Sequence, residues 1–148
     1  MSAGRAGILL GVLAACGTPG PRPPVVGQDA CRHCHMALAD PRFAAELVTR
    51  TGRVLVFDDV GCLAAWIGSG GTPLEDIHSV WVADFAAPDT LIEAREAVFL
   101  ATASVHTPMD YGIIALRPGA ADSIRAELGG EVIPWEEVRG RVGAGSRR

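Results

Sequence analysis

One order of elements occurs twice along the chain, and this repeat limits the folds that the sequence can adopt. Apolar runs within residues 43–58 flank a Thr-Gly pair, which is typical of a β-hairpin. An Asp-Asp pair then caps a predicted helix over residues 60–67, and a glycine-rich stretch ends it. The same order recurs over residues 97–130, again before paired glycines. The repeat predicts an α+β fold of two similar ββαβ units packed together.

Shorter apolar runs complete the two predicted units. The expected strands cover residues 43–50, 53–58, 79–85, 91–94, 97–103, 112–117 and 131–133, with a turn at Pro88-Asp89. A second helix is expected over residues 120–128, where Ile124 and Leu128 lie one turn apart. These elements place one domain over residues 30–140, divided at about residue 72, and leave residues 141–148 as a flexible tail.

The N-terminal segment has the layout of an export signal. A positive charge at Arg5 precedes a short apolar run, which is too short to span a membrane. Leu13-Ala14-Ala15-Cys16 resembles the bacterial lipobox, in which the cysteine is lipidated after residues 1–15 are removed. Ordinary cleavage is the alternative, but it would leave an exposed thiol at Cys16. We therefore expect a lipid-anchored protein of the bacterial cell envelope, on the periplasmic face of a membrane.

Residues 16–29 are predicted to be a spacer. They are rich in proline and glycine, which favours an extended, flexible linker rather than a core. The whole chain has a formal net charge of −4 and contains no lysine. An acidic chain without a basic run is a poor nucleic-acid binder, so no nucleic-acid partner is expected.

The cysteine count points to a reactive or metal-bound thiol. With Cys16 assigned to lipid, Cys31, Cys34 and Cys62 remain, an odd number in an exported protein. Cys62 follows the capping Asp-Asp pair, so we expect it to be buried at the start of a helix with a structural role rather than as a ligand.

The stretch CRHCHM over residues 31–36 admits four interpretations. As C-x-x-C-H it is the attachment motif of c-type haem, with His35 and Met109 as axial ligands. The apolar residues lie mostly in β-patterned runs, however, whereas small c-type cytochromes are helical. A thiol–disulfide oxidoreductase would place its C-x-x-C at the start of a helix after a strand, and here a linker precedes the pair. Structural zinc requires four Cys or His ligands, which adjacent residues rarely supply.

A Cu(I) site fits the ligand types of this stretch best. Thiolates and thioethers are soft donors, which favour Cu(I) over hard cations. Met36 follows Cys34 by two residues, and Met109 lies in a polar loop where a core methionine is not expected. His106, three residues before Met109, is a further possible ligand, and so is His35.

Five segments together resemble the NosL family of copper-binding lipoproteins, the nitrous oxide reductase accessory proteins. They are CRHCHM, VLVFDDVGCLAAWI, IEAREAVFL, TPMDYGIIAL and GGEVIPWEEV, in the family's order from Cys31 to Val138. The family usually has C-x-x-C-G-M, and this chain has His35 in place of that glycine. A histidine adopts left-handed backbone conformations less readily than glycine does, so this departure can change the backbone geometry of the loop.

The resemblance implies a non-enzymatic function. It implies two related ββαβ units and a metallochaperone that binds Cu(I) outside the cytoplasm. By motif, the ligands that it implies are Cys31, Cys34, Met36 and Met109. The partner would be a copper-accepting cuproenzyme or its assembly factors, with nitrous oxide reductase as the family's implied recipient.

Overall fold

The computed structural model describes residues 17–145, and for residues 143–145 only the backbone. The predicted signal segment and Cys16 lie outside the described residues. Among the helices that are described, none combines the length and apolar character needed to cross a membrane.

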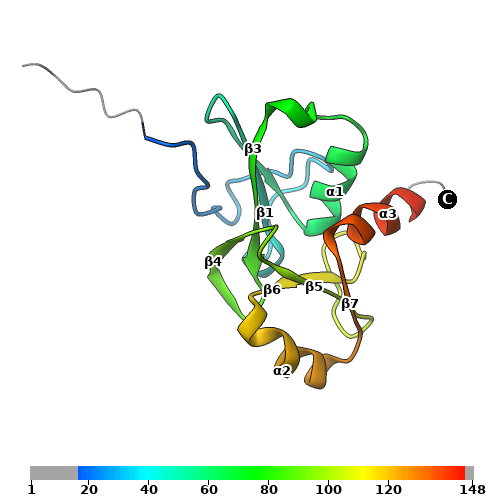
Figure 1. The fold of residues 1–148 in the computed structure, drawn as a ribbon. Helices are drawn as coiled ribbons and strands as arrows, with labels where there is room; N and C mark the ends of the chain where they lie inside the picture. The colour runs from blue at the N-terminus through cyan, green and yellow to red at the C-terminus, as the bar shows by residue number, and fades with distance from the viewer. Residues whose placement is uncertain (1–16, 146–148) are drawn as a thin grey trace, which may run out of the picture.

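The first unit is built on a four-stranded antiparallel sheet in the order β2-β1-β3-β4 (Figure 1). Its strands are β1 (Ala45–Thr49), β2 (Val54–Phe57), β3 (Ile77–Asp84) and β4 (Ala87–Glu93). Helix α1 (Val60–Gly68) follows β2, and two 3-10 turns, η1 (Pro41–Phe43) and η2 (Leu74–Asp76), precede β1 and β3. Asp59 begins α1 because its side chain accepts a hydrogen bond from the backbone N–H of Cys62.

The second unit repeats this topology on a three-stranded antiparallel sheet in the order β6-β5-β7. Its elements are β5 (Val98–Ala101), β6 (Ile113–Leu116), α2 (Pro118–Leu128), β7 (Glu131–Ile133) and α3 (Trp135–Gly145). In both units the first strand is central, the second pairs on one side of it, and the strand after the helix pairs on the other. The predicted α+β fold of two similar ββαβ units is confirmed.

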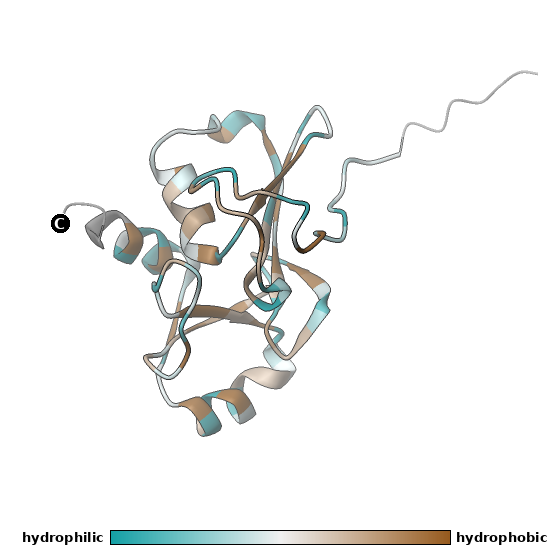
Figure 2. Ribbon diagram, turned by 180° about the vertical axis from the view of Figure 1, so that it is seen from behind, coloured by the Kyte–Doolittle hydropathy of each residue, from teal (hydrophilic) through white to brown (hydrophobic). Residues whose placement is uncertain are grey.

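The two units share one apolar core. Alternate residues of β5 face opposite sides, so that Phe99 joins the core around α1 while Leu100 packs with α2. Ile113 and Ile114 of β6 divide in the same way. Burial on both faces explains why these strands are continuous apolar runs. Figure 2 shows the resulting concentration of hydrophobic residues in the strands and in α1.

The sheets meet where β3 ends beside β6. The backbone N–H of Phe85 donates to the carbonyl of Ala115 at 2.9 Å. Arg117 Nε lies 2.8 Å from Oδ2 of Asp84, a carboxylate with no exposed surface. A buried charge needs such a partner, so this ion pair adds a polar contact to the junction of the two units.

Strand β4 begins earlier than the sequence pattern indicates. The expected turn at Pro88-Asp89 is instead part of β4, and the chain reverses at Phe85 and Ala86. The register shifts between Ala83 and Asp84, and β4 pairs on one side only. An edge strand tolerates proline because one row of its N–H groups has no partner strand.

Both ends of the described domain extend past the expected boundaries. Helix α3 continues beyond residue 140 because the side chain of Val142 is buried in the core. At the other end, Arg22 pairs with Asp29, and Leu38 donates its N–H to the carbonyl of Asp29. The segment expected to be a flexible linker is therefore tied to the domain from Arg22 onward.

This N-terminal segment covers a buried carboxyl group. Glu46 on β1 is fully buried, and its Oε2 accepts the backbone N–H of Arg22 at 3.1 Å, while Oε1 has no protein partner. Burial raises the pKa of Glu46 to about 7, against the opposing effect of Arg22.

We expect Glu46→Gln to flatten the pH dependence of stability. The folded carboxyl keeps its proton up to about pH 7, whereas the unfolded one loses it near 4.5, so wild-type stability falls as the pH rises between these values. The variant should lose the contribution of Glu46 to this slope, a difference of up to about 3 kcal/mol in the free energy of unfolding, while the raised pKa of Asp58 leaves a smaller slope in place.

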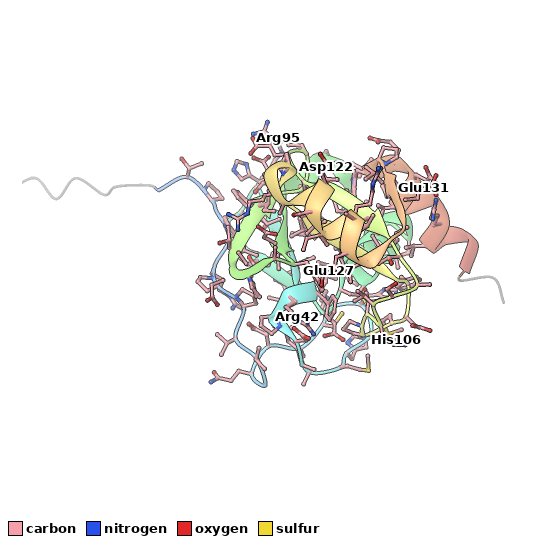
Figure 3. All side chains as sticks on the ribbon, turned by 90° about the horizontal axis from the view of Figure 1, so that it is seen from below. Arg42, Arg95, His106, Asp122, Glu127 and Glu131 are labelled. Carbon is pink, nitrogen blue, oxygen red and sulfur yellow. The ribbon has the colours of Figure 1, made fainter. Side chains whose placement is uncertain are left out.

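Urea denaturation at a series of pH values measures the slope. Glu127→Gln, on the exposed side of α2 (Figure 3), makes the same change of charge outside the core and should keep the wild-type slope. Equal slopes for Glu46→Gln and the wild type would show that Glu46 is ionised in the folded protein.

Candidate metal centre

A tight loop presents Cys31 and Cys34. Ala30 and Ala37 form an isolated antiparallel bridge, and within it the N–H of Cys31 donates to the carbonyl of Met36 at 2.8 Å. The N–H of Arg32 donates to the carbonyl of Val56 at 2.8 Å, which fastens the loop to β2. These bonds hold Cys31 against the core and leave the next turn of the loop facing outward.

Helix α1 supplies the third cysteine. Cys62 lies in its first turn, where its N–H donates to Asp59 Oδ1 at 2.7 Å. The N-terminus of a helix carries partial positive charge, which favours negative groups such as thiolates. The predicted position of Cys62, buried at the start of a helix, is confirmed.

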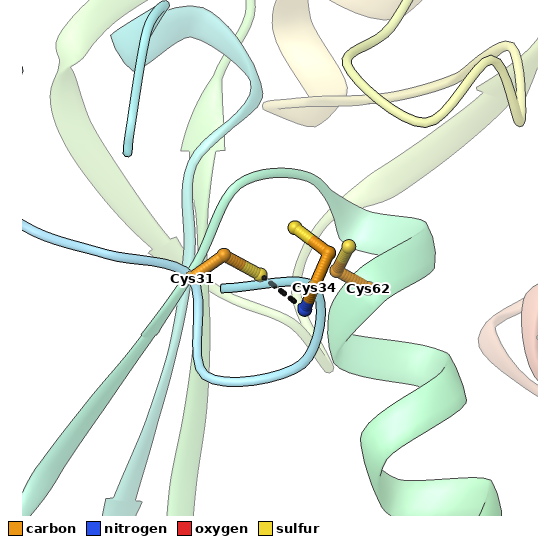
Figure 4. Close-up of side chains that lie close together, drawn as sticks. All are labelled: Cys31, Cys34 and Cys62. Atoms are coloured by element: carbon orange, nitrogen blue, oxygen red, sulfur yellow. Dashed lines mark hydrogen bonds between the residues drawn. The ribbon is translucent and has the colours of Figure 1, made fainter. Parts of the chain in front are cut away.

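The sulfur atoms of Cys31, Cys34 and Cys62 converge (Figure 4). All three Sγ atoms lie within 4.8 Å of one another. Cys31 is 1% exposed and Cys62 is 0% exposed, whereas Cys34 is half-buried. None of the three forms a disulfide. Three thiols at this spacing, two of them buried, can close around one soft metal ion.

Cys31 is the thiol that this environment ionises most readily. The Cys62 thiol donates a hydrogen bond to the Cys31 sulfur and so lowers the pKa of Cys31 well below its usual value. Backbone N–H groups of the loop add to this, among them that of Cys34, whose nitrogen lies 3.5 Å from Cys31 Sγ. The hydrogen bond between the Cys62 and Cys31 side chains raises the pKa of Cys62, because Cys62 is the donor. Burial raises the pKa of Cys34.

Two buried carboxyl groups adjoin the thiols. Asp59 has no exposed surface and uses both its oxygens as acceptors. Asp58 Oδ1 is buried without a hydrogen-bond partner in the described structure. Burial, followed by the negative charges of Cys31 and Asp59, raises the pKa of Asp58 to about 6. The surroundings of the cluster are therefore rich in negative charge, which suits a cation.

The structure places the two predicted methionine ligands at the exposed surface. Met36 is 44% exposed and belongs to the same loop as Cys31 and Cys34. Met109 is 37% exposed, and its backbone N–H donates to Asp59 Oδ2 at 3.0 Å, which brings the second unit's loop to the start of α1. His106 and Asp110 of that loop are exposed and lie 3.2 Å apart.

Cys62 is the residue whose part in the site was not predicted. Its burial was expected, but its sulfur lies with the other two thiols rather than alone in the core. The signals for it are the odd cysteine count and its place in one of the five segments that resemble the NosL family, while nothing local relates residue 62 to a loop about thirty positions earlier.

His35 occupies the position that is commonly glycine in the C-x-x-C-G-M pattern, and it adopts a backbone conformation that glycine favours. Its φ is +65°, in the left-handed region. The loop thus keeps the turn that a glycine would allow, because the N–H of His35 donates to the carbonyl of Cys31 at 3.0 Å. A residue with a side chain is strained in this conformation, so His35 makes the loop less stable than glycine would.

A two-unit α+β fold with three converging thiols defines a candidate soft-metal-binding protein. The NosL family model matches residues 23–142, which is most of the chain, so the chain belongs to the NosL family. The resemblance predicted from the five sequence segments is confirmed.

A solved structure has the same fold. The crystal structure of the copper chaperone NosL from Shewanella denitrificans matches with a TM-score of 0.62 and 20% sequence identity. The match covers 79% of this chain and 96% of the other. No match is found among curated protein sequences.

Replacing His35 with glycine should stabilise the loop. The variant removes the left-handed strain, and we expect the free energy of unfolding to rise by about 1 kcal/mol. His33→Gly is the matched control, because the φ of His33 is not positive. It should lower stability by roughly 0.5–1 kcal/mol through backbone entropy. Chemical denaturation of both variants makes the comparison, and destabilisation by His35→Gly would contradict the account of strain.

Proposed function

We propose that this protein is a Cu(I)-binding metallochaperone that delivers copper outside the cytoplasm. The observation that carries the proposal is the convergence of Cys31, Cys34 and Cys62. Thiolates are soft ligands, which select Cu(I) over hard cations such as Mg²⁺ and Ca²⁺. A chain from a family that includes a copper chaperone supports this choice of metal.

We assign Met36 and Met109 to the exposed side of the site. The buried thiols Cys31 and Cys62 would hold the ion from within, and the half-buried Cys34 would join them to the thioethers. An acceptor ligand can then approach from the methionine side before the thiols release the ion. This gradient of exposure suits transfer, and we assign no catalytic reaction to it.

The geometry favours a metal site over the two alternative functions. Thioether bonds to haem would require the sulfur of Cys31 to reach a porphyrin, but that sulfur lies in the core beside Cys62. A thiol–disulfide oxidoreductase places its C-x-x-C at a helix start, whereas this pair lies in a turn. The described arrangement supports metal binding best.

We further propose a copper-accepting cuproenzyme or its assembly factors as the partner, with nitrous oxide reductase as the first candidate. The basis is the family to which the chain belongs. Mixing the Cu(I)-loaded protein with a copper-free candidate enzyme, and measuring copper in each after separation, tests this step directly.

Purified, reduced protein should bind about one Cu(I), and Met109→Ala should weaken this binding about tenfold, or ~1.4 kcal/mol. The physical reason is the loss of one soft ligand while the three thiols remain. Competition with a chromogenic Cu(I) chelator measures the affinity. Val132→Ala, which shortens an exposed apolar side chain on β7, is the control and should bind as the wild type does.

Two results would count against this assignment. An unchanged affinity in Met109→Ala would remove Met109 from the site. An intense Soret band that survives denaturation, in protein made with the haem-attachment machinery present, would indicate covalent haem and end the copper proposal.

We propose that a lipid on Cys16 anchors the protein to the periplasmic face of a membrane in the bacterial cell envelope. The lipobox-like sequence supports this. Mass spectrometry of the mature protein should find an N-terminal Cys16 with added acyl mass, and Cys16→Ser should abolish that mass. A mature chain with an unmodified Cys16 would contradict the anchor.

A further inference from the structure

Asp59 joins the two units at the thiol cluster. Its Oδ1 accepts the N–H of Cys62 at 2.7 Å, and its Oδ2 accepts the N–H of Met109 at 3.0 Å. The two donors are far apart in the chain, one in α1 and the other in the loop between β5 and β6. One fully buried carboxylate therefore sets the distance between a thiol-bearing helix and a methionine-bearing loop.

The loop is built to transmit this placement to Met109. The N–H of Asp110 donates to the carbonyl of Thr107 at 2.8 Å, and the N–H of Gly112 donates to Thr107 Oγ1 at 3.3 Å. The ring of Tyr111 packs on Gly61, where a Cβ atom would collide with it. The loop is thus braced internally and docks on the first turn of α1 at two neighbouring points.

A helix cap alone does not account for both contacts. Capping needs one side-chain oxygen, which Oδ1 provides to Cys62. The contact of Oδ2 with Met109 adds nothing to the helix, and it buries a full carboxylate where a neutral cap would serve. The second oxygen satisfies the part-buried N–H of Met109 and so fixes the backbone of this residue relative to the thiol-bearing helix.

We propose that Asp59 is a positioning residue. It holds Met109 beside the thiol cluster, so that the thioether of Met109 adds to the affinity of the site for Cu(I). The inference rests on the proposed Cu(I) site and adds to it a residue that does not touch the metal. Groups that hold metal ligands in place change affinity by about 10- to 100-fold when they are removed.

Asp59→Asn separates the two contacts. Asparagine caps helices about as well as aspartate does, so its single carbonyl oxygen can still accept the N–H of Cys62. Its amide group is a donor and cannot accept the N–H of Met109. Asp59→Ser is a second variant with the same logic, because serine also caps with one oxygen.

The test is a double-mutant cycle on the full chain, with Cu(I) affinity measured by chelator competition. The four proteins are the wild type, Asp59→Asn, Met109→Ala and the double variant. We expect Asp59→Asn to weaken binding about tenfold or more. In that background Met109→Ala should cost less than about twofold, because its thioether is already out of place. Local charge effects of Asp59→Asn cancel in the cycle.

X-ray absorption counts the sulfur neighbours of the bound copper, a number that should not change if Asp59 only stabilises the fold. Both single variants should lose about one sulfur neighbour of the bound copper while the thiolate ligands remain. Asp122→Asn, on the exposed side of α2 (Figure 3), makes the same substitution elsewhere and should match the wild type. Thermal unfolding checks that each variant is folded.

The outcomes distinguish the two proposals. Failure of the wild type to bind Cu(I) would overturn the proposed function and this inference with it. If the wild type binds, and the effects of Asp59→Asn and Met109→Ala add in full, the site stands and the positioning role of Asp59 falls. An unchanged sulfur count in Asp59→Asn or Asp59→Ser would overturn that role as well.

Discussion

The apolar core shared by the two sheets is the constraint on which the rest of the structure depends. Phe99 of β5 and Leu47 of β1 pack in the same cluster around α1, so neither unit buries its sheet alone. This packing fixes the start of α1 between the units. The thiol cluster lies at that point because Cys62 is in the first turn of α1 and the loop of Cys31 is fastened to β2.

Local patterns in the sequence predict much of this fold. The hairpin of β1 and β2 and the start of α1 follow from turn chemistry and capping, which act over a few residues. The start of β4 does not follow, because Pro88 signals a turn in isolation and only an edge position in the sheet permits it within a strand. Tertiary context decides such cases.

The residues of the site also fall into those that local sequence can predict and those that it cannot. Cys31, Cys34 and Met36 lie within one short loop, so the sequence marks them as candidate soft-metal ligands, although the same spacing also fits haem attachment and a redox dithiol. The sulfur of Cys62 and the backbone of Met109 reach this region only through the docking of α1 and of a loop from the other unit. No residue near Cys62 in the sequence records that docking, and the same residue type in a buried helix often serves packing alone.

The electrostatics of this region favour the binding of a cation. Cys31, Asp58 and Asp59 place several ionisable groups in a buried volume, and each negative charge there disfavours the next. The N–H groups of the loop and the start of α1 offset part of this cost. They are dipoles, however, and they add no net positive charge. Under the proposed function, a monovalent metal ion bound by the thiolates would supply the missing charge, and its release would restore the repulsion. Electrostatics would thus favour holding the ion, and its release would depend on an acceptor whose ligands replace the thiolates.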